Sequence, residues 1–139
     1  MVILDTNVLL ESLRPCPSPS VAAWFQATHR SSIYTTSITM AEVLCGIAVL
    51  PDGGRKRALM EAAVKIFEVD LADRVLDFTG DAARAYVRIM AARRAAGRPM
   101  SSMDAMIAAI AVSHKATLAT RNTRDFEGCG VRLVNPFGG

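Results

Sequence analysis

The chain has 139 residues, the length of one ordinary domain, and 51% of them are hydrophobic, which excludes an intrinsically disordered protein. No apolar run reaches the roughly 18 residues that a membrane span needs, and we find no basic, cleavable leader, so we expect a cytoplasmic protein with no membrane partner. The three cysteines lack the paired spacing of a disulfide framework or a zinc site, and the formal net charge of +3 alone is weak evidence for a polyanionic partner.

Short runs rich in β-branched residues alternate with longer segments of helical periodicity. Strands are predicted at residues 2–5, 32–36, 74–79, 116–120 and 131–134. Helices are predicted at residues 8–14, 19–30, 40–50, 54–67, 81–96 and 103–114. The last of these helices is apolar on nearly every face, which predicts that it is buried.

This alternation predicts an α/β fold, with one domain over residues 1–139 and a central parallel sheet of four to five strands flanked by helices. In such sheets, sites lie beyond the carboxyl ends of the strands. Asp5 ends the first predicted strand and is therefore expected at that edge. Thr6 or Asn7 could cap the helix that follows.

Three acidic residues, Asp5, Glu42 and Asp104, are candidates for chemistry, and each has a structural alternative. Asp5 could be an ordinary turn residue. Glu42 fits a capping box with Thr39, and Asp104 follows Ser101 in a similar helix start. The helix after Asp104 is predicted to cross the core, so this carboxylate is expected in a partly enclosed place at a helix N-terminus.

The predicted topology can bring these three carboxylates to one edge of the sheet. Close carboxylates repel one another, and a divalent cation would relieve that repulsion. Ligands that are all oxygen suit Mg²⁺, for which Mn²⁺ can substitute, and carboxylate-held metals among basic residues can hydrolyse phosphodiesters. Such a site would suit hydrolysis by a metal-activated water that attacks phosphorus, but three scattered acids are common and their spacing alone does not establish this chemistry.

Basic residues are clustered along the chain. Each cluster alone fits a solvated helix face, but together they favour contacts with the phosphates of a nucleic acid. The three clusters are Arg55, Lys56 and Arg57; then Arg84, Arg88, Arg93, Arg94 and Arg98; and then Arg121, Arg124 and Arg132.

Four segments in this order, LDTNVLLESL, SITMAEVLCG, SSMDAMIAAIA and TLATRNTRDF, closely resemble the PIN domain. The similarity is to the VapC and FitB-like toxins of bacterial toxin–antitoxin pairs, and it covers nearly the whole chain, including the ending VNPF. It implies a single PIN-like α/β domain with an Mg²⁺-dependent or Mn²⁺-dependent ribonuclease site. It also implies homodimers and a cognate antitoxin, with a DNA-binding N-terminus, that blocks the site.

The resemblance also assigns individual residues. Asp5, Glu42 and Asp104 match the family's acidic, metal-binding positions. Thr6 matches the small hydroxyl residue beside the first acid, and Asn7 matches the residue that orders that turn.

The sequence departs from the family near Asn122, where many relatives carry a fourth acid. Asp125 lies three residues later and would share a face with Asn122 if this segment formed a helical turn. Alternatively, Asp125 only caps that turn and never meets metal. We assign Asp125 to the catalytic group, and Asn122, Arg121 and Thr6 to substrate binding, with Arg121 as a phosphate contact.

Two other functions stay open on the sequence alone. One is an Mg²⁺-dependent phosphatase of the haloacid-dehalogenase type, although those enzymes carry an acid where Asn7 stands. The other is a non-catalytic acidic pocket that receives a basic segment of a partner.

Overall fold

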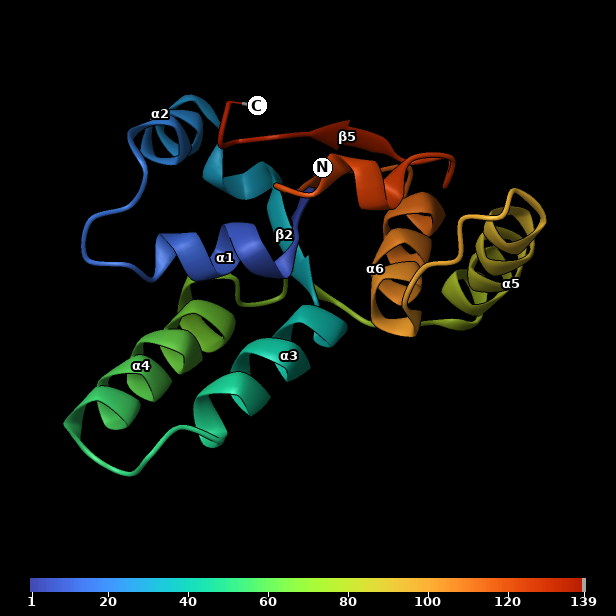
Figure 1. Ribbon diagram of the computed structural model, residues 1–139. Coiled ribbons are helices and arrows are strands. Elements are labelled where there is room, and N and C mark those ends of the chain that lie inside the picture. The colour runs from blue at the N-terminus through green and yellow to red at the C-terminus, as the bar shows by residue number, and fades with distance from the viewer. Residues whose placement is uncertain (139) are drawn as a thin grey trace.

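The computed structural model of the protein describes residues 1–138 (Figure 1). Within them, five strands form one parallel sheet in the order β3-β2-β1-β4-β5, as the sequence predicts. Every strand is short, and the segment predicted at residues 74–79 contributes only two paired residues. The strands are β1 (Val2–Leu4), β2 (Ile33–Thr36), β3 (Val75–Leu76), β4 (Thr117–Ala119) and β5 (Arg132–Val134).

The strand order reverses at the central strand, β1. The chain proceeds from β1 to β2 and β3 on one side, and then crosses to β4 and β5 on the other. Leu4 of β1 is in register with Ala119 of β4. The next residues, Asp5 and Thr120, therefore leave the sheet side by side. This is the switch point at which open parallel sheets place their ligand sites.

All six predicted helices form, and residues 1–138 also contain three short helical turns. The helix predicted at residues 19–30 ends at Ala27, and the one predicted at residues 54–67 ends at Lys65 and continues as the π-helical turn η2. No helix among residues 1–138 is long and apolar enough to cross a bilayer. The helices are α1 (Thr6–Ser12), α2 (Pro19–Ala27), α3 (Ser37–Ala48), α4 (Gly54–Lys65), α5 (Gly80–Ala95) and α6 (Ser102–Ser113), and the turns are η1 (Arg30–Ser32), η2 (Ile66–Asp70) and η3 (Thr123–Phe126).

The prediction for the start of α3 is wrong by three residues. The helix begins at Ser37 rather than at residue 40, because Thr36 occupies the N-cap position. The Thr36 hydroxyl accepts the backbone N–H of Thr39 at 3.0 Å. Thr39 is therefore a buried residue inside the helix, and the capping box predicted for Thr39 and Glu42 does not form.

The sheet separates two hydrophobic clusters. Successive residues of a strand point to opposite faces, so Ile3 and Leu118 pack on the side of α5 and α6. Leu4 and Ala119 pack on the side of α1, α3 and α4. Figure 1 shows the two groups of helices on the two sides of the sheet. The core thus supports the carboxyl ends of β1 and β4 from both faces.

Helix α6 is buried along most of its length, as its apolar composition predicts. Six of its residues are fully buried, and four of these are alanines, which let α6 lie close to α5 and to the sheet. Its N-terminus, which carries Asp104, is consequently fixed against the core. The six residues are Ala105, Ile107, Ala108, Ala109, Ile110 and Ala111.

A larger side chain inside α6 should destabilise the protein. We expect Ala109→Leu to lower the free energy of unfolding by about 1–3 kcal/mol, because the close-packed core must shift to accept the added carbons. Ala91→Leu, on the exposed face of α5, is the control and should stay within about 0.5 kcal/mol of the wild type. Urea unfolding measures both, and equal losses in the two variants would contradict this description of the core.

Candidate active site

The first predicted acid, Asp5, is buried at the carboxyl end of β1, with 4% of its surface exposed. Its Oδ1 accepts the Thr6 backbone N–H at 2.8 Å, so Asp5 itself is the N-cap of α1. The prediction that Thr6 or Asn7 caps this helix is therefore wrong. Its Oδ2 accepts the Thr120 hydroxyl at 2.8 Å and the Asn7 amide at 3.4 Å.

A small polar network joins the ends of β1 and β4. The side-chain oxygen of Asn7 accepts the backbone N–H of Arg121 at 3.0 Å, so Asn7 links the turn after β1 to the segment after β4. The hydroxyl of Thr120, which is fully buried, also accepts the backbone N–H of Asn122 at 3.1 Å. The sequence did not predict the bond from Thr120 to Asp5. The only available signal was a hydroxyl residue at the end of the strand predicted at residues 116–120.

Glu42 lies in the second turn of α3 and is half-buried. Because the capping box does not form, its carboxylate is free to point toward α1. Its Oε1 accepts the Thr6 hydroxyl at 2.8 Å. Thr6 thus contacts two of the predicted acids, with its backbone N–H on Asp5 and its hydroxyl on Glu42.

Asp104 lies in the first turn of α6 and is half-buried. The Ser101 hydroxyl accepts the Asp104 backbone N–H at 3.1 Å, which confirms the predicted capping start. The backbone of Asp104 serves the helix cap, and its carboxylate is still available to the site.

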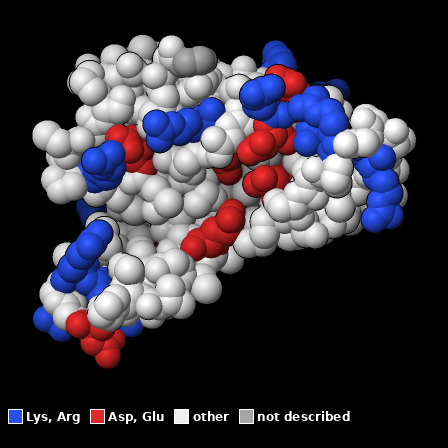
Figure 2. All heavy atoms as spheres, in the orientation of Figure 1, with Lys and Arg blue, Asp and Glu red and all other residues white. Residues whose placement is uncertain are grey.

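The carboxylates influence one another electrostatically. Burial raises the pKa of Asp5, the hydrogen bonds from Thr120 and Thr6 oppose that rise, and the charges of Asp104 and Glu42 add to it. Burial also raises the pKa of Asp104. A side-chain hydrogen bond from Ser101 to the Asp104 carboxylate opposes that rise, and the charge of Asp125 adds to it. Figure 2 shows acidic side chains gathered across the middle of one face, with basic side chains beside them.

The donor set suits a hard divalent cation, because it consists of carboxylate oxygens whose mutual repulsion is not neutralised. Among residues 1–138, however, no three His, Cys, Asp or Glu side chains meet closely enough to hold an ion together. A cation bound by Asp5, Glu42 and Asp104 would therefore require side-chain rotation.

The fourth acidic position lies on η3. Asn122 precedes this turn and makes no side-chain capping bond, and its carbonyl oxygen accepts the Asp125 backbone N–H at 3.0 Å. The helical turn that would let Asp125 share a face with Asn122 therefore forms. Asp125 is exposed, yet it is close enough to raise the pKa of Asp104. The structure thus brings Asp125 to the acidic cluster, whereas Asn122 lies exposed beside it.

The predicted basic contacts divide into two kinds. Arg121 is exposed at the edge of the site, and its guanidinium lies 4.6 Å from the centre of the Phe137 ring. Arg93, in contrast, is buried, donates to the backbone carbonyls of Arg98 and Glu127, and also contacts the Cys129 thiol. Arg93 therefore cannot be the surface phosphate contact that its cluster suggested.

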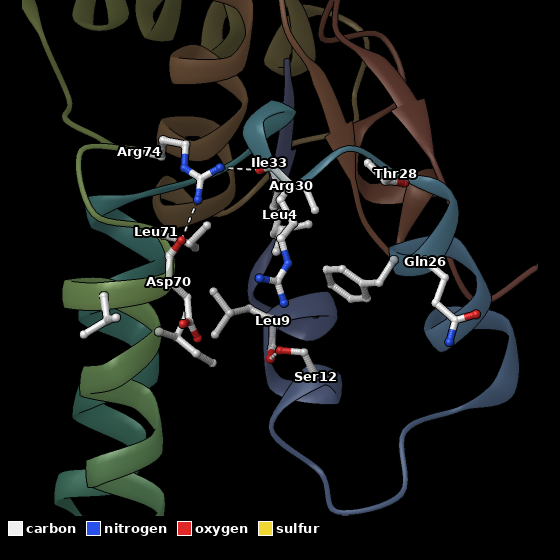
Figure 3. A pocket seen from close by; sticks show the side chains of 13 residues that line it. Leu4, Leu9, Ser12, Gln26, Thr28, Arg30, Ile33, Asp70, Leu71 and Arg74 are labelled. Atoms are coloured by element: carbon white, nitrogen blue, oxygen red, sulfur yellow. Dashed lines mark hydrogen bonds between the residues drawn. The ribbon is translucent and has the colours of Figure 1, made fainter.

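A cavity of about 740 Å³ lies away from the acidic cluster, among α1, α2 and η2 (Figure 3). Arg30 points into it beside Leu9, and Arg74 closes one side by donating to the backbone oxygens of Arg30 and Asp70. None of the predicted acids lines this cavity. We therefore place the chemistry at the switch point.

Replacing Asp104 should stabilise the metal-free protein at neutral pH. The pKa of Asp104 in the folded protein lies above the ordinary aspartate value that it has in the unfolded chain. At a pH between these two pKa values, the folded state therefore binds more protons than the unfolded chain. The charged Asp104 therefore costs stability above this window. We expect Asp104→Asn to melt at a higher temperature than the wild type near pH 7, and this gain to vanish as pH falls to about 4.

Thermal melts in EDTA across this pH range measure the effect. Asp77→Asn, at an exposed position outside the cluster, is the matched control and should change the melting temperature little at any pH. An Asp104→Asn variant that melts below the wild type at neutral pH would show that this carboxylate is a net stabilising group.

Comparison with known proteins agrees with the architecture. The PIN domain family model matches residues 2–128. VapC ribonuclease Y4jK of Sinorhizobium fredii is 37% identical over 137 residues (99% of this chain and 98% of that protein), and Toxin FitB of Neisseria gonorrhoeae is 36% identical over 137 residues (99% of each). A solved structure of FitAB bound to an IR36 DNA fragment is 35% identical and covers 100% of this chain and 97% of its own, with a TM-score of 0.93. The chain therefore belongs to the PIN domain family, and it is similar to the VapC and FitB members of that family.

Proposed function

We propose that this protein is the ribonuclease toxin of a toxin–antitoxin pair and cleaves RNA with a divalent cation, Mg²⁺ or Mn²⁺, held by Asp5, Glu42 and Asp104. The observation that carries the proposal is the convergence of these acids, from β1, α3 and α6, beside the switch point of the sheet. The relatives named as a VapC ribonuclease and a FitB toxin support the same activity.

The residues around the acids keep them in place for this reaction. Thr120 and Thr6 hold the Asp5 carboxylate from two sides, and Thr6 also orients Glu42. When bound, the cation supplies a water of lowered pKa and offsets the charge that develops on the phosphate. Arg121 and Asn122, exposed at the rim, bind the RNA backbone. Cleavage leaves a 5′-phosphate and a 3′-hydroxyl.

A hollow beside Glu42 offers a place for the antitoxin. It measures about 690 Å³, lies between α1, α3 and α4, and is largely apolar. The side chains of Leu13, Ile47 and Leu59 line it, and Glu42 lies in its wall. An antitoxin segment with apolar side chains would bury this surface, and a basic residue on it would pair with Glu42 and block the acidic site. The solved structure of FitAB bound to an IR36 DNA fragment supports a partner of this kind.

A homodimer is the second assembly that we propose. Val87 of α5 is 64% exposed and Met103 of α6 is 36% exposed, although both side chains are large and apolar. These two helices pack against each other, so one interface could cover both residues.

Glu42 should be needed for chemistry and not for folding. We expect Glu42→Gln to abolish Mg²⁺-dependent RNA cleavage with little change in stability, because Gln can still accept the Thr6 hydroxyl but carries no charge. Thr36→Ala is the control, since it removes the true cap of α3 and should cost about 1 kcal/mol while leaving cleavage intact.

Labelled RNA incubated with and without Mg²⁺, together with urea unfolding, tests this pair. The proposal is wrong if Glu42→Gln retains near-normal cleavage. A wild type that cleaves no RNA but binds a basic peptide would favour the non-catalytic acidic pocket, and a stable aspartyl-phosphate on Asp5 would favour the phosphatase.

Asn122 and Asp125, at the fourth acidic position, should change the affinity of the site for metal without being essential for binding. We expect Asp125→Asn to raise the Mg²⁺ concentration needed for cleavage, but by less than Asp5→Asn does, because Asp125 is exposed and Asp5 is buried. Asn122→Asp should tighten metal binding, since it adds a charged oxygen ligand. Titration calorimetry with Mn²⁺ is the measurement. Two tight sites in the RNA-free wild type, unchanged in Asp125→Asn, would contradict this assignment.

A further inference from the structure

Arg93, near the end of α5, is a buried charge with an uncommon set of partners. It is 6% exposed, and no carboxylate pairs with it among residues 1–138. Its Nε donates to the backbone oxygen of Arg98 at 2.6 Å, and its Nη1 donates to the backbone oxygen of Glu127 at 2.6 Å. The planar guanidinium thus joins two segments that lie far apart in the sequence.

The first segment is the connection that leads to Asp104. Gly97, with a φ of +69°, ends α5 in the left-handed conformation and turns the chain. The backbone N–H of Arg98 then returns to the backbone oxygen of Arg93 at 2.9 Å. Both backbone groups of Arg98 are therefore bound by Arg93, shortly before Ser101 caps α6 and places Asp104.

The second segment carries Asp125. Arg93 binds the backbone oxygen of Glu127, and the Arg98 side chain reaches the backbone oxygen of Arg124 at 3.3 Å and the Glu127 carboxylate at 3.4 Å. Asp125 lies between these two anchored residues. We call Arg93 and Arg98, with the backbone oxygens that they bind, the arginine clamp. Arg93, Arg98 and Asp104 all act electrostatically on the thiol of Cys129, which places the clamp close to the acidic cluster.

We propose that Arg93 is a positioning residue, which fixes the η3 segment against the start of α6 and thereby holds Asp125 at the distance from Asp104 that the metal site needs. The proposal deepens the proposed function and rests on it for its catalytic part. A buried guanidinium that binds backbone carbonyls rather than a carboxylate is costly to bury, so we expect each of its hydrogen bonds to matter for the placement of the segments it joins.

The catalytic test is a double-mutant cycle on cleavage of a labelled RNA. We expect Arg93→Met and Asp125→Asn each to raise the Mg²⁺ concentration for half-maximal cleavage, by about tenfold for Arg93→Met, with little change in the KM for RNA. The double variant should need no more Mg²⁺ for half-maximal cleavage than whichever single variant needs more, because both changes remove the same ligand position. Effects that multiply in the double variant would overturn the proposal.

Arg94→Met is the matched control, because Arg94 is the neighbouring arginine of the same helix and is exposed. It should leave the Mg²⁺ requirement unchanged. An Arg94→Met variant that shifts this requirement as far as Arg93→Met does would reduce the effect to a loss of positive charge, and so overturn the proposal.

Amide hydrogen exchange gives a second readout that needs neither metal nor activity. We expect exchange in residues 122–127 to become about tenfold faster in Arg93→Met, while exchange in residues 102–113 is unchanged. Arg93→Lys keeps the charge but lacks the two-pronged donor, and it serves if Arg93→Met does not fold. We expect residues 122–127 of Arg93→Lys to exchange faster than in the wild type, by less than tenfold.

The two readouts separate the two proposals. A wild type that cleaves no RNA with any divalent cation would overturn the proposed function, and the exchange rates would still decide the clamp. Unchanged exchange in residues 122–127 of either Arg93 variant would overturn the clamp itself, whatever the activity.

Discussion

The hydrogen bond from Thr120 to Asp5 joins the central strand to its neighbour where the strand order reverses, and the rest of the site depends on it. A carboxylate buried to this degree is costly unless donors surround it. Thr120 comes from β4, and Thr6 and Asn7 come from the turn after β1. The sheet register that aligns Leu4 with Ala119 is therefore also what makes an ionised Asp5 tolerable.

Around Asp5, the folded protein tolerates repulsion between carboxylates at one edge of the sheet because the hydrophobic core stabilises the rest of the fold. The charges of Glu42 and Asp104 raise the pKa of Asp5, so these acids work against folding when they are ionised together. The alanine-rich core along α6 fixes the backbone of this helix, whose first turn carries Asp104. A site that gathers charge in advance stores free energy that a cation or a basic partner segment can release on binding. This is a common trade between stability and function.

Much of this arrangement follows from local sequence patterns. The alternation of strands and helices predicted the parallel sheet, the position of Asp5 after the first strand predicted its place at the edge, and the apolar residues of α6 predicted a buried helix. These features depend on periodicity and on residue types that end or begin elements, and both are readable over a few neighbouring residues.

Other features depend on contacts between distant segments or on a local competition. Thr36 and Thr39 both suit the cap of α3, and their sequence does not decide between them, so Glu42 was misread as part of a capping box. The bond from Thr120 to Asp5 requires the register of β1 on β4. Arg93 belongs to an arginine-rich helix, and only the packing of η3 against α5 distinguishes it from its exposed neighbour Arg94.

The shortness of the outer strands has a consequence for how this protein can be recognised. β3 and β5 form the two edges of the sheet, with two and three residues respectively. An extended peptide that joined either edge would gain only a few backbone hydrogen bonds, too few to anchor it by strand addition. Recognition must then rely on side chains that cover helices and loops. The same short edges protect the folded protein from pairing edge to edge with other copies as its concentration rises.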